Sequence, residues 1–405
     1  MITQTLLPST TGPITASSEQ APRATLRQTV KRRFHALKMK LAERPARYLA
    51  RRYDARQGLA ARLLSVFDAP HPPEQPDQQL LAPSEAIPWI EPRFPASGKE
   101  AKHALTRMKT DGSLRTTPAG VISAENVSVS FPNSMHWWQG RLFEEAFLNP
   151  NLLTNPKYVL DLLKLKFSPK QPLSEAILLS LPWHHNFYHW MIEMLPRLAL
   201  VERAGNLGHL KLLVPKSSPA YVRESLELCG WADRVQWMPD GAYQATLLHI
   251  PTRLAVASDV PPAALYWLHR TMPQATSPTR RRLYVSRADA RNRFVINEAE
   301  LQPLLQKHGF ETVRMSEHSV AEQIQLFRQA DIVIGSHGAA FANLAFMQPG
   351  GKFIEFFESG FFNRAYHRIC STLGIDYGFL VGAKEGMGYR IEPDELEATI
   401  QKLLA

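Results

Sequence analysis

The sequence has few cysteines and no long hydrophobic run. Cys229 and Cys370 are its two cysteines, and they lie far apart in a chain of 405 residues. Two such residues make neither a disulfide framework nor a zinc site, so a reducing compartment is expected. No run of about 18 apolar residues occurs, so no membrane-spanning helix is expected. The first residues lack a basic start followed by an apolar stretch, which disfavours a secretory signal.

The composition is otherwise that of a globular protein. Hydrophobic residues make up 44% of the chain and charged residues 21%, which excludes global disorder. The net charge of +10 is concentrated in one segment, where thirteen Lys and Arg lie between Arg23 and Arg62 and are opposed by Glu43 and Asp54. The rest of the chain is close to neutral and lacks nucleic-acid motifs, so no nucleic-acid partner is expected.

Three segments precede the globular core. Residues 1–22 are rich in Ser, Thr and Pro and are expected to be disordered. Residues 23–67 carry apolar residues at a three-to-four spacing, which predicts a basic amphipathic helix with a kink at Pro45. Such a helix suits an anionic membrane surface, and packing on its own protein body is the alternative. Residues 68–118 are proline-rich and indicate a linker or an extended strap.

The remaining chain predicts two α/β domains. Strands and helices alternate over residues 119–265 and again over residues 279–385, with a break at Pro261–Pro278. The alternation indicates parallel sheets covered by helices on both faces. Residues 386–405 are expected to form a C-terminal helix. Open parallel sheets bind ligands at the carboxyl ends of their strands, so a cleft between the two domains is the expected site.

The strongest chemical signal lies in residues 331–351. An apolar strand leads there into Gly335, Ser336, His337 and Gly338, and a helix follows. Glycines let a phosphate approach the backbone, and the free N–H groups at a helix start bind anions. His337 can donate a hydrogen bond to the same anion. A tight strand-to-helix turn without a ligand is the alternative interpretation.

A polar stripe marks the helix that is predicted to begin at His185. His185, His189 and Glu193 recur every four residues, and Arg197 continues the same face. A polar stripe on an otherwise apolar helix has to face something polar. Three interpretations stay open: a catalytic cleft with a general base, a metal site with His and Glu ligands, and a hydrogen-bonded brace.

Arginines follow the strand that is predicted at residues 282–286. Arg287, Arg291 and Arg293 lie at its carboxyl end, and their guanidinium groups suit the oxygens of a diphosphate. A solvated loop is the alternative. Glu355, on the strand after the glycine-rich turn, is either a ligand for ribose hydroxyls or a surface acid.

The order of these motifs resembles glycosyltransferase family 61, which was long described as a domain of unknown function. The resemblance covers about residues 120–385 and rests on residues 185–198, 283–287, 297–298 and 334–350. The family includes bacterial capsular-polysaccharide enzymes, plant xylan xylosyl- and arabinosyltransferases, and animal O-linked N-acetylglucosaminyl- and O-mannose-type transferases.

The resemblance implies a GT-B-like fold, in which two Rossmann-like domains face a central cleft. It also implies inverting transfer from a nucleotide sugar, usually a UDP-sugar, without a cofactor or an essential metal. His189 and Glu193 would be catalytic. The residues expected to bind the acceptor are His185, Asn186 and Arg197. The residues expected to bind the donor are Arg287, Arg293, Gly335, Ser336, His337, Gly338, Asn343 and Glu355.

We therefore expect an inverting glycosyltransferase of bacterial surface or capsular polysaccharide synthesis, acting on a saccharide or lipid-linked saccharide. It would be cytoplasmic and peripheral at the inner face of the cell membrane. Ala340 stands where the family often has glycine, and Ala342 stands where it often has threonine. These changes motivate one alternative, a non-catalytic assembly protein that keeps the fold. A metal-dependent hydrolase that uses His185, His189 and Glu193 is the other alternative.

Overall fold

The computed structural model divides the chain into residues 1–52 and residues 53–405. The residues that it describes are 63–64, 77–82, 86–87, 90–94, 98–109, 114–115, 119–139, 142–143, 156–254, 260–277 and 280–405. The predicted tail and the predicted basic helix up to residue 62 lie outside these residues. No helix of the described residues is long and apolar enough to cross a membrane.

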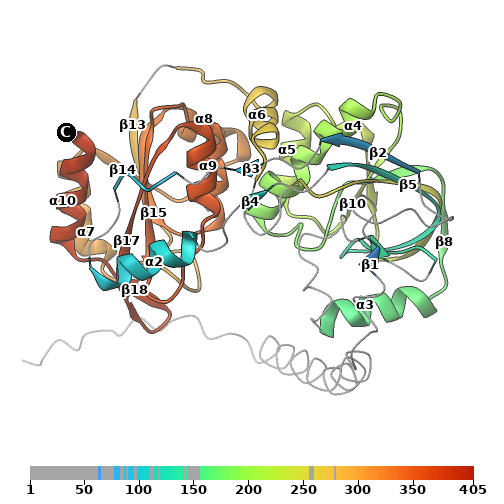
Figure 1. Cartoon of the computed structure of the whole chain (residues 1–405), viewed down its shortest axis with the longest axis horizontal. Helices are drawn as coiled ribbons and strands as arrows, with labels where there is room; N and C mark the ends of the chain where they lie inside the picture. The colour runs from blue at the N-terminus through green and yellow to red at the C-terminus, as the bar shows by residue number, and fades with distance from the viewer. Residues whose placement is uncertain are drawn as a thin grey trace, which may run out of the picture. The chain divides into compact units, whose positions relative to one another are not determined.

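The C-terminal sheet is doubly wound (Figure 1). Its spatial order is β14-β13-β15-β16-β17-β18. The strands are β13 (Arg281–Val285), β14 (Phe310–Val313), β15 (Ala330–Ser336), β16 (Lys352–Glu358), β17 (Asp376–Glu385) and β18 (Gly388–Arg390). All pairs are parallel except β17 with β18. Chain order reverses between β13 and β15, which makes this point of the sheet the expected ligand site.

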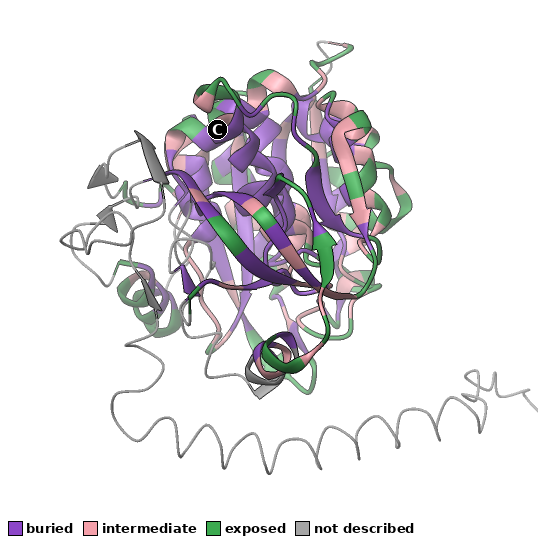
Figure 2. Ribbon diagram, turned by 90° about the vertical axis from the view of Figure 1, so that its right-hand side faces the viewer, coloured by how far each residue is buried: buried purple, intermediate pink, exposed green. Residues whose placement is uncertain are grey.

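Helices cover both faces of this sheet, as its uninterrupted apolar strands require. The helices are α7 (Glu298–Lys307), α8 (Val320–Arg328), α9 (Ala365–Leu373) and α10 (Pro393–Leu404). On β15, Ile332 and Ile334 pack in one cluster with residues of α7 and α10. Val333, between them, packs in the other cluster with residues of α8 and α9. Alternate side chains of the strand therefore point to opposite helical layers, and the strands are mostly buried. Figure 2, seen from the side of the N-terminal sheet, shows buried residues gathered in the interior of the molecule and exposed residues towards the outside.

The N-terminal sheet is mixed, so the prediction of a parallel sheet there is wrong. Its main path is β11-β10-β9-β12-β5-β2, and β6 and β8 pair with β5 and β12. The strands are β2 (Asp77–Ala82), β5 (Ala119–Phe131), β6 (Met135–Trp137), β8 (Gln171–Leu173), β9 (Ala176–Leu178), β10 (Leu212–Pro215), β11 (Val235–Met238) and β12 (Gly241–Pro251). Strands β9 to β12 run parallel, but β5 lies antiparallel to both β12 and β2. The alternating strand-helix pattern begins only after β5, which explains the error.

Three predicted segments contain further structure. Leu63–Leu64, at the end of the predicted basic helix, forms strand β1 and pairs with β7 (Leu142–Phe143). The predicted strap contains β2, β3 (Ala86–Ile87), α2 (Lys99–Lys109) and β4 (Leu114–Arg115). The predicted break contains α6 (Pro262–Thr271), which begins with a proline in its first turn, where the missing N–H costs nothing.

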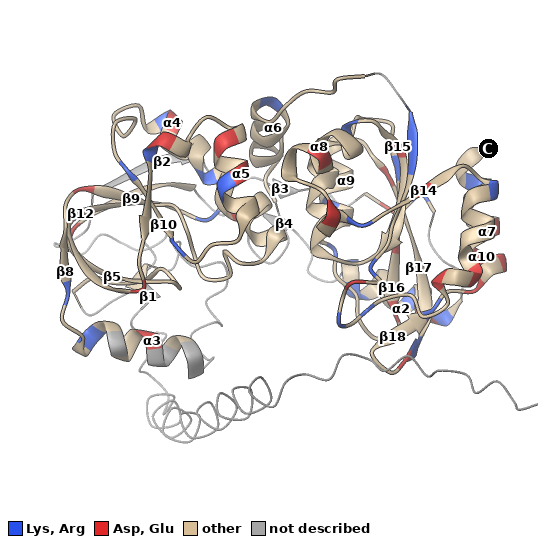
Figure 3. Cartoon of the chain, turned by 180° about the vertical axis from the view of Figure 1, so that it is seen from behind, with Lys and Arg blue, Asp and Glu red and all other residues tan. Residues whose placement is uncertain are grey.

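The C-terminal segment differs from the prediction at its start. Residues 386–405 are not helical throughout, because β18 precedes α10. Helix α3 (Pro156–Phe167) follows β7 and precedes β8 in the chain. Acidic and basic residues are interspersed over the described elements (Figure 3), as expected for a nearly neutral body.

Candidate active site

A pocket of about 240 Å³ lies at the switch point of the C-terminal sheet. Arg287 and Asp289 line it from the loop after β13, and Ser336 and Gly338 line it from the turn after β15. The first residues of η8 (Ala339–Phe346) complete this side. The predicted helix here is of the 3₁₀ type, and its first N–H groups also lack intrahelical partners. Basic and glycine-rich loops therefore meet where the strand order places a ligand.

Two glycines permit this close approach of the loops. A Cβ at Gly335 would lie 2.6 Å from the carbonyl oxygen of Val285, and the φ of Gly335 is +153°. A Cβ at Gly338 would lie 2.1 Å from Nη1 of Arg287. The guanidinium group of Arg287 thus rests on the backbone of the turn. Burial, followed by the charge of Arg293, lowers the pKa of Arg287.

Arg293 lies beside this pocket rather than among its lining residues. Its backbone is left-handed, with a φ of 55°, and its guanidinium carbon lies 4.4 Å from the centroid of the Phe361 ring. This contact holds a second positive charge close to Arg287.

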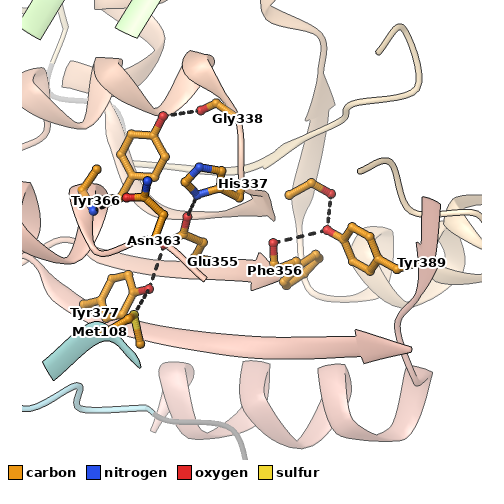
Figure 4. A network of polar contacts seen from close by, with 11 residues as sticks. Met108, His337, Gly338, Glu355, Phe356, Asn363, Tyr366, Tyr377 and Tyr389 are labelled. Carbon is orange, nitrogen blue, oxygen red and sulfur yellow. Dashed lines mark hydrogen bonds and ion pairs between the residues drawn. The ribbon is translucent and has the colours of Figure 1, made fainter. Parts of the chain in front are cut away.

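His337 forms a buried pair with Glu355 (Figure 4). Nδ1 of His337 is hydrogen-bonded to Oε1 of Glu355, and the hydroxyl of Tyr377 donates to Oε2 at 2.7 Å. Burial, followed by the charge of Glu355, raises the pKa of Tyr377 well above its ordinary value. Glu355 is fully buried, so the prediction that it holds a ribose is wrong. It fixes the ring of His337 instead.

Two further tyrosines hold the turn between β15 and η8 (Figure 4). The hydroxyl of Tyr366 donates to the carbonyl oxygen of Gly338 at 2.6 Å. The hydroxyl of Tyr389 donates to Oγ of Ser336 at 2.5 Å. Neither tyrosine carries a signal in the sequence, because each reaches the turn from a distant element. Both rigidify the loop that lines the pocket.

Asn343 does not line the pocket. It is fully buried, and its Nδ2 donates to Oε1 of Gln323 and to the carbonyl oxygen of Ala340, each at 2.9 Å. The predicted donor contact of Asn343 is therefore replaced by a brace between η8 and α8.

A second histidine–carboxylate pair lies on an irregular helix. Nδ1 of His189 lies 2.5 Å from Oε2 of Glu193. The helix is of the π type over η4 (His189–Met194), 3₁₀ over η5 (Leu195–Arg197) and α over α4 (Leu198–Ala204). Pro196 offers no N–H to the preceding turn, which explains the irregularity. Such π segments occur frequently at functional sites.

The other residues of the predicted polar stripe have different positions. His185 is exposed in the turn before the helix, so it does not share a helical face with the pair. Oδ1 of Asn186 accepts from the backbone N–H groups of Tyr188 at 3.0 Å and His189 at 3.4 Å, and thus caps the helix.

Arg197 is a buried brace, and its predicted contact with an acceptor is wrong. It is fully buried, and its guanidinium group donates to backbone carbonyls at the ends of β9 and β12. The carbonyls belong to Leu178, Leu179, Pro251 and Thr252. Burial lowers its pKa to about 9.

Aromatic rings connect the two histidine–carboxylate pairs. The ring centroid of Tyr188 lies 5.5 Å from that of His189 and 5.7 Å from that of Tyr366. The Tyr366 centroid lies 5.0 Å from that of His337. The indole of Trp183 lies 4.9 Å from the ring of His189, and Trp183 has a strained φ of 74°. The ring of His189 is thus packed between aromatic rings, and the contacts through Tyr188 and Tyr366 connect it to His337 beside the pocket.

No set of three His, Cys, Asp or Glu side chains within the described ranges is grouped to hold a metal ion. His185 lies outside the helix that carries His189 and Glu193. The ligand set that the hydrolase alternative needs is therefore not assembled.

Comparison with protein families identifies the central part of this chain. Residues 187–354 match the family model of Glycosyltransferase 61. This part of the chain is similar to the glycosyltransferase 61 family. No curated protein matches the chain.

The glycosyltransferase 61 match confirms the family that the order of motifs suggested. It begins two residues before His189 and ends one residue before Glu355, so it includes the pocket. Within the matched residues, the pocket brings together Arg287, Ser336 and Gly338.

Proposed function

We propose that the protein is an inverting glycosyltransferase that uses a nucleotide sugar, with a UDP-sugar as the first candidate. The observation that carries the proposal is the pocket at the switch point, where Arg287 rests against the turn at Gly338 in a glycosyltransferase 61 domain. A guanidinium group and the backbone N–H groups at a helix start together suit a diphosphate. Fixed positive charge would then take the part that a divalent cation plays in other transferases.

His189 is the proposed base, and Glu193 is its positioning residue. The side chain of His189 is 22% exposed, whereas that of Glu193 is 6% exposed. Because Glu193 holds Nδ1, the other ring nitrogen of His189 can take a proton from an acceptor hydroxyl. The π segment and the cap by Asn186 support the orientation of this ring.

The proposed reaction is a single displacement at C1 of the sugar. The acceptor oxygen forms a bond to C1 as the bond between C1 and the diphosphate oxygen breaks. The acceptor proton passes to His189, and the nucleoside diphosphate leaves with the electron pair. Arg287 and the turn at Gly338 would stabilise the charge that develops on the leaving group.

The proposed acceptor is a saccharide or lipid-linked saccharide of bacterial surface or capsular polysaccharide. The family resemblance and the basic composition of residues 23–62 support this setting. The enzyme would then act in the cytoplasm, at the anionic inner face of the cell membrane.

A thermal-shift panel tests nucleotide binding. UDP, GDP, CMP and ADP are compared with and without EDTA on the wild type and on His337→Ala. A nucleotide at about 100 times its dissociation constant adds about 2.7 kcal/mol to the free energy of unfolding. We expect an EDTA-insensitive shift with one nucleotide that is lost in His337→Ala. Absence of any shift would contradict the proposal.

Turnover of the nucleotide sugar that corresponds to the stabilising nucleotide tests the base. His189→Ala should lower kcat by about 10²- to 10⁴-fold while nucleotide binding is retained. Glu193→Gln should lower kcat by a smaller factor, because it removes only the orienting carboxylate. His209→Ala, at an exposed histidine, is the control that should leave kcat unchanged. Unaltered turnover in His189→Ala would show that His189 is not the base.

A further inference from the structure

The pocket at the switch point has one acidic side chain among the described residues that line it, Asp289. Asp289 is exposed, and Oγ of Ser316 donates to its Oδ2 at 2.5 Å. Asp289 follows β13 and Ser316 follows β14, so their contact lies on the β14 side of the pocket. Arg287 and Gly338 lie between β13 and β15. The pocket therefore has a basic part and an acidic part on opposite sides of β13.

This distribution of charge suits a ligand that has a phosphate at one end and hydroxyl groups at the other. A carboxylate repels a phosphate, whereas it accepts hydrogen bonds from hydroxyl groups. A carboxylate has about four acceptor positions, of which Ser316 occupies one. Two adjacent hydroxyl groups match the remaining positions. Val285 and Met315, both buried, add apolar surface to the same pocket.

The other polar groups near this part of the pocket are already bonded within the protein. Oγ of Ser286 donates to Glu298 at 2.8 Å, and Oγ of Ser336 accepts from Tyr389. Glu355 is fully buried and is bonded to His337 and Tyr377. In doubly wound sheets that bind nucleotides, an acidic residue near the switch point takes the ribose hydroxyls. Asp289 lies near that point here, in the loop after β13 and in contact with the loop after β14.

We propose that Asp289, oriented by Ser316, accepts hydrogen bonds from the ribose diol of the donor nucleotide. The site then selects ribonucleotides over 2′-deoxyribonucleotides. This inference rests on the proposed function, because it requires a nucleotide in the same pocket.

Calorimetry on the full chain tests the inference with UDP, 2′-deoxy-UDP and 3′-deoxy-UDP. Should GDP or ADP be the stabilising nucleotide in the thermal-shift panel, it and its deoxy forms are used in place of the uridine set. The wild type should bind the ribonucleotide about 10- to 100-fold more tightly than the deoxy forms, as expected for hydrogen bonds to a charged group. Asp289→Asn should reduce that ratio to below about threefold. The measured quantity is the ratio of the ribonucleotide affinity to the deoxynucleotide affinity. Loss of the negative charge changes the affinity for the phosphates equally in all three ligands, so that effect cancels in the ratio.

Two variants accompany this measurement. Ser316→Ala should reduce the ratio in the same direction as Asp289→Asn, because it removes the group that orients the carboxylate. Glu385→Gln, at an exposed acid on β17 outside the pocket, should leave the ratio unchanged. If Asp289→Asn does not fold, Ser316→Ala provides the same test, and an unchanged ratio would contradict the inference.

The outcomes separate this inference from the proposed function. Equal binding of the ribo and deoxy forms by the wild type would overturn the role of Asp289 and leave the transferase proposal standing. An unaltered ratio in Asp289→Asn would do the same. If no nucleoside diphosphate binds the wild type, both proposals fail together.

Discussion

Two histidines of the described chain each hold a carboxylate at Nδ1, but the two pairs are built differently. His189 and Glu193 lie four residues apart on one helix, a spacing that is visible in the sequence. His337 and Glu355 come from the turn after β15 and from the adjacent strand β16. Their contact depends on the register of two strands. The first pair suits proton transfer, and the second fixes a ring beside the pocket.

At the scale of the residue, adding a methyl group at Gly338 tests whether the position of Arg287 matters for nucleotide binding. In Gly338→Ala, the new Cβ would lie 2.1 Å from Nη1 of Arg287. The φ of Gly338 is −171°, so the backbone is not strained and the long arginine side chain moves instead. We expect the affinity for the stabilising nucleotide to fall at least tenfold in calorimetry, with little change in Tm.

Gly208→Ala is the matched control for this substitution, because nothing lies within 4 Å of a Cβ there. It should change neither the affinity nor Tm. Wild-type nucleotide affinity in Gly338→Ala would show that the guanidinium position does not matter for binding.

At the scale of the element, the irregular helix from His189 to Ala204 decides which side chains share a face. A regular α-helix would align His185, His189, Glu193 and Arg197 along one stripe. The π and 3₁₀ turns change the angular step, and the helix begins after His185. Arg197 therefore turns inward and joins the ends of β9 and β12. The central pair, His189 and Glu193, keeps the contact that its spacing predicts.

Strand β6 carries a buried histidine that makes the stability of this region depend on pH. The backbone N–H of Phe143 donates to Nε2 of His136 at 3.1 Å. Burial, followed by the charge of Arg197, lowers the pKa of His136 from 6.5 to about 3. Between these values the unfolded chain binds a proton that the folded chain does not. Folding is therefore favoured above pH 6.5, and stability falls as the pH drops towards 3.

Urea unfolding between pH 7.5 and 4.5 measures this effect. The contribution of His136 to the slope approaches about 1.4 kcal/mol per pH unit. His136→Gln should flatten the dependence relative to the wild type, whatever its stability at pH 7.5. His209→Gln, at an exposed histidine, should keep the wild-type slope. Identical slopes in His136→Gln and the wild type would contradict the assignment.

At the scale of the whole molecule, a segment between β2 and β5 of the N-terminal sheet contacts the C-terminal sheet. Phe94 pairs with Gly378 on β17, and Arg93 forms an ion pair with Asp376 at 2.7 Å. The hydroxyl of Tyr377 lies 3.9 Å from the sulfur of Met108 on α2. Because Tyr377 also holds Glu355, this segment reaches the group behind His337. It supports the site and is more than a connecting linker.

The membrane role of the basic segment is tested with a shortened chain. The natural place to cut is before Tyr53, where the second unit begins, because this keeps β1 and its pairing with β7. The cut removes eleven Lys and Arg and two Glu, and each cation near an anionic surface contributes about 1 kcal/mol. We expect co-sedimentation with phosphatidylglycerol-containing vesicles to be lost, while turnover on a soluble acceptor is retained.

Two controls accompany this test: vesicles of phosphatidylcholine alone, and phosphatidylglycerol-containing vesicles at high salt. The full chain should not co-sediment with the vesicles in either case. Equal sedimentation of the full and shortened chains would exclude residues 1–52 as the membrane-binding segment.

The sequence by itself determined those features that depend on neighbouring residues. Alternating apolar strands and helices predicted the C-terminal sheet, and α10 (Pro393–Leu404) follows from its acidic first turn and apolar spacing. The turn at residues 335–338 and the pair of His189 with Glu193 were also visible, because short spacings carry them. The order of four motifs indicated the family.

The tertiary structure alone decided the contacts between distant elements. It paired Glu355 with His337 and Tyr377 and turned Arg197 inward. It also brought Tyr366 and Tyr389 to the turn, and Asp289 into contact with Ser316. It also paired β5 antiparallel to β12. Local periodicity reports which face of an element is apolar, but it carries no record of which distant strand or side chain will meet that face. Contacts between distant elements depend on strand register and on the packing of the whole core.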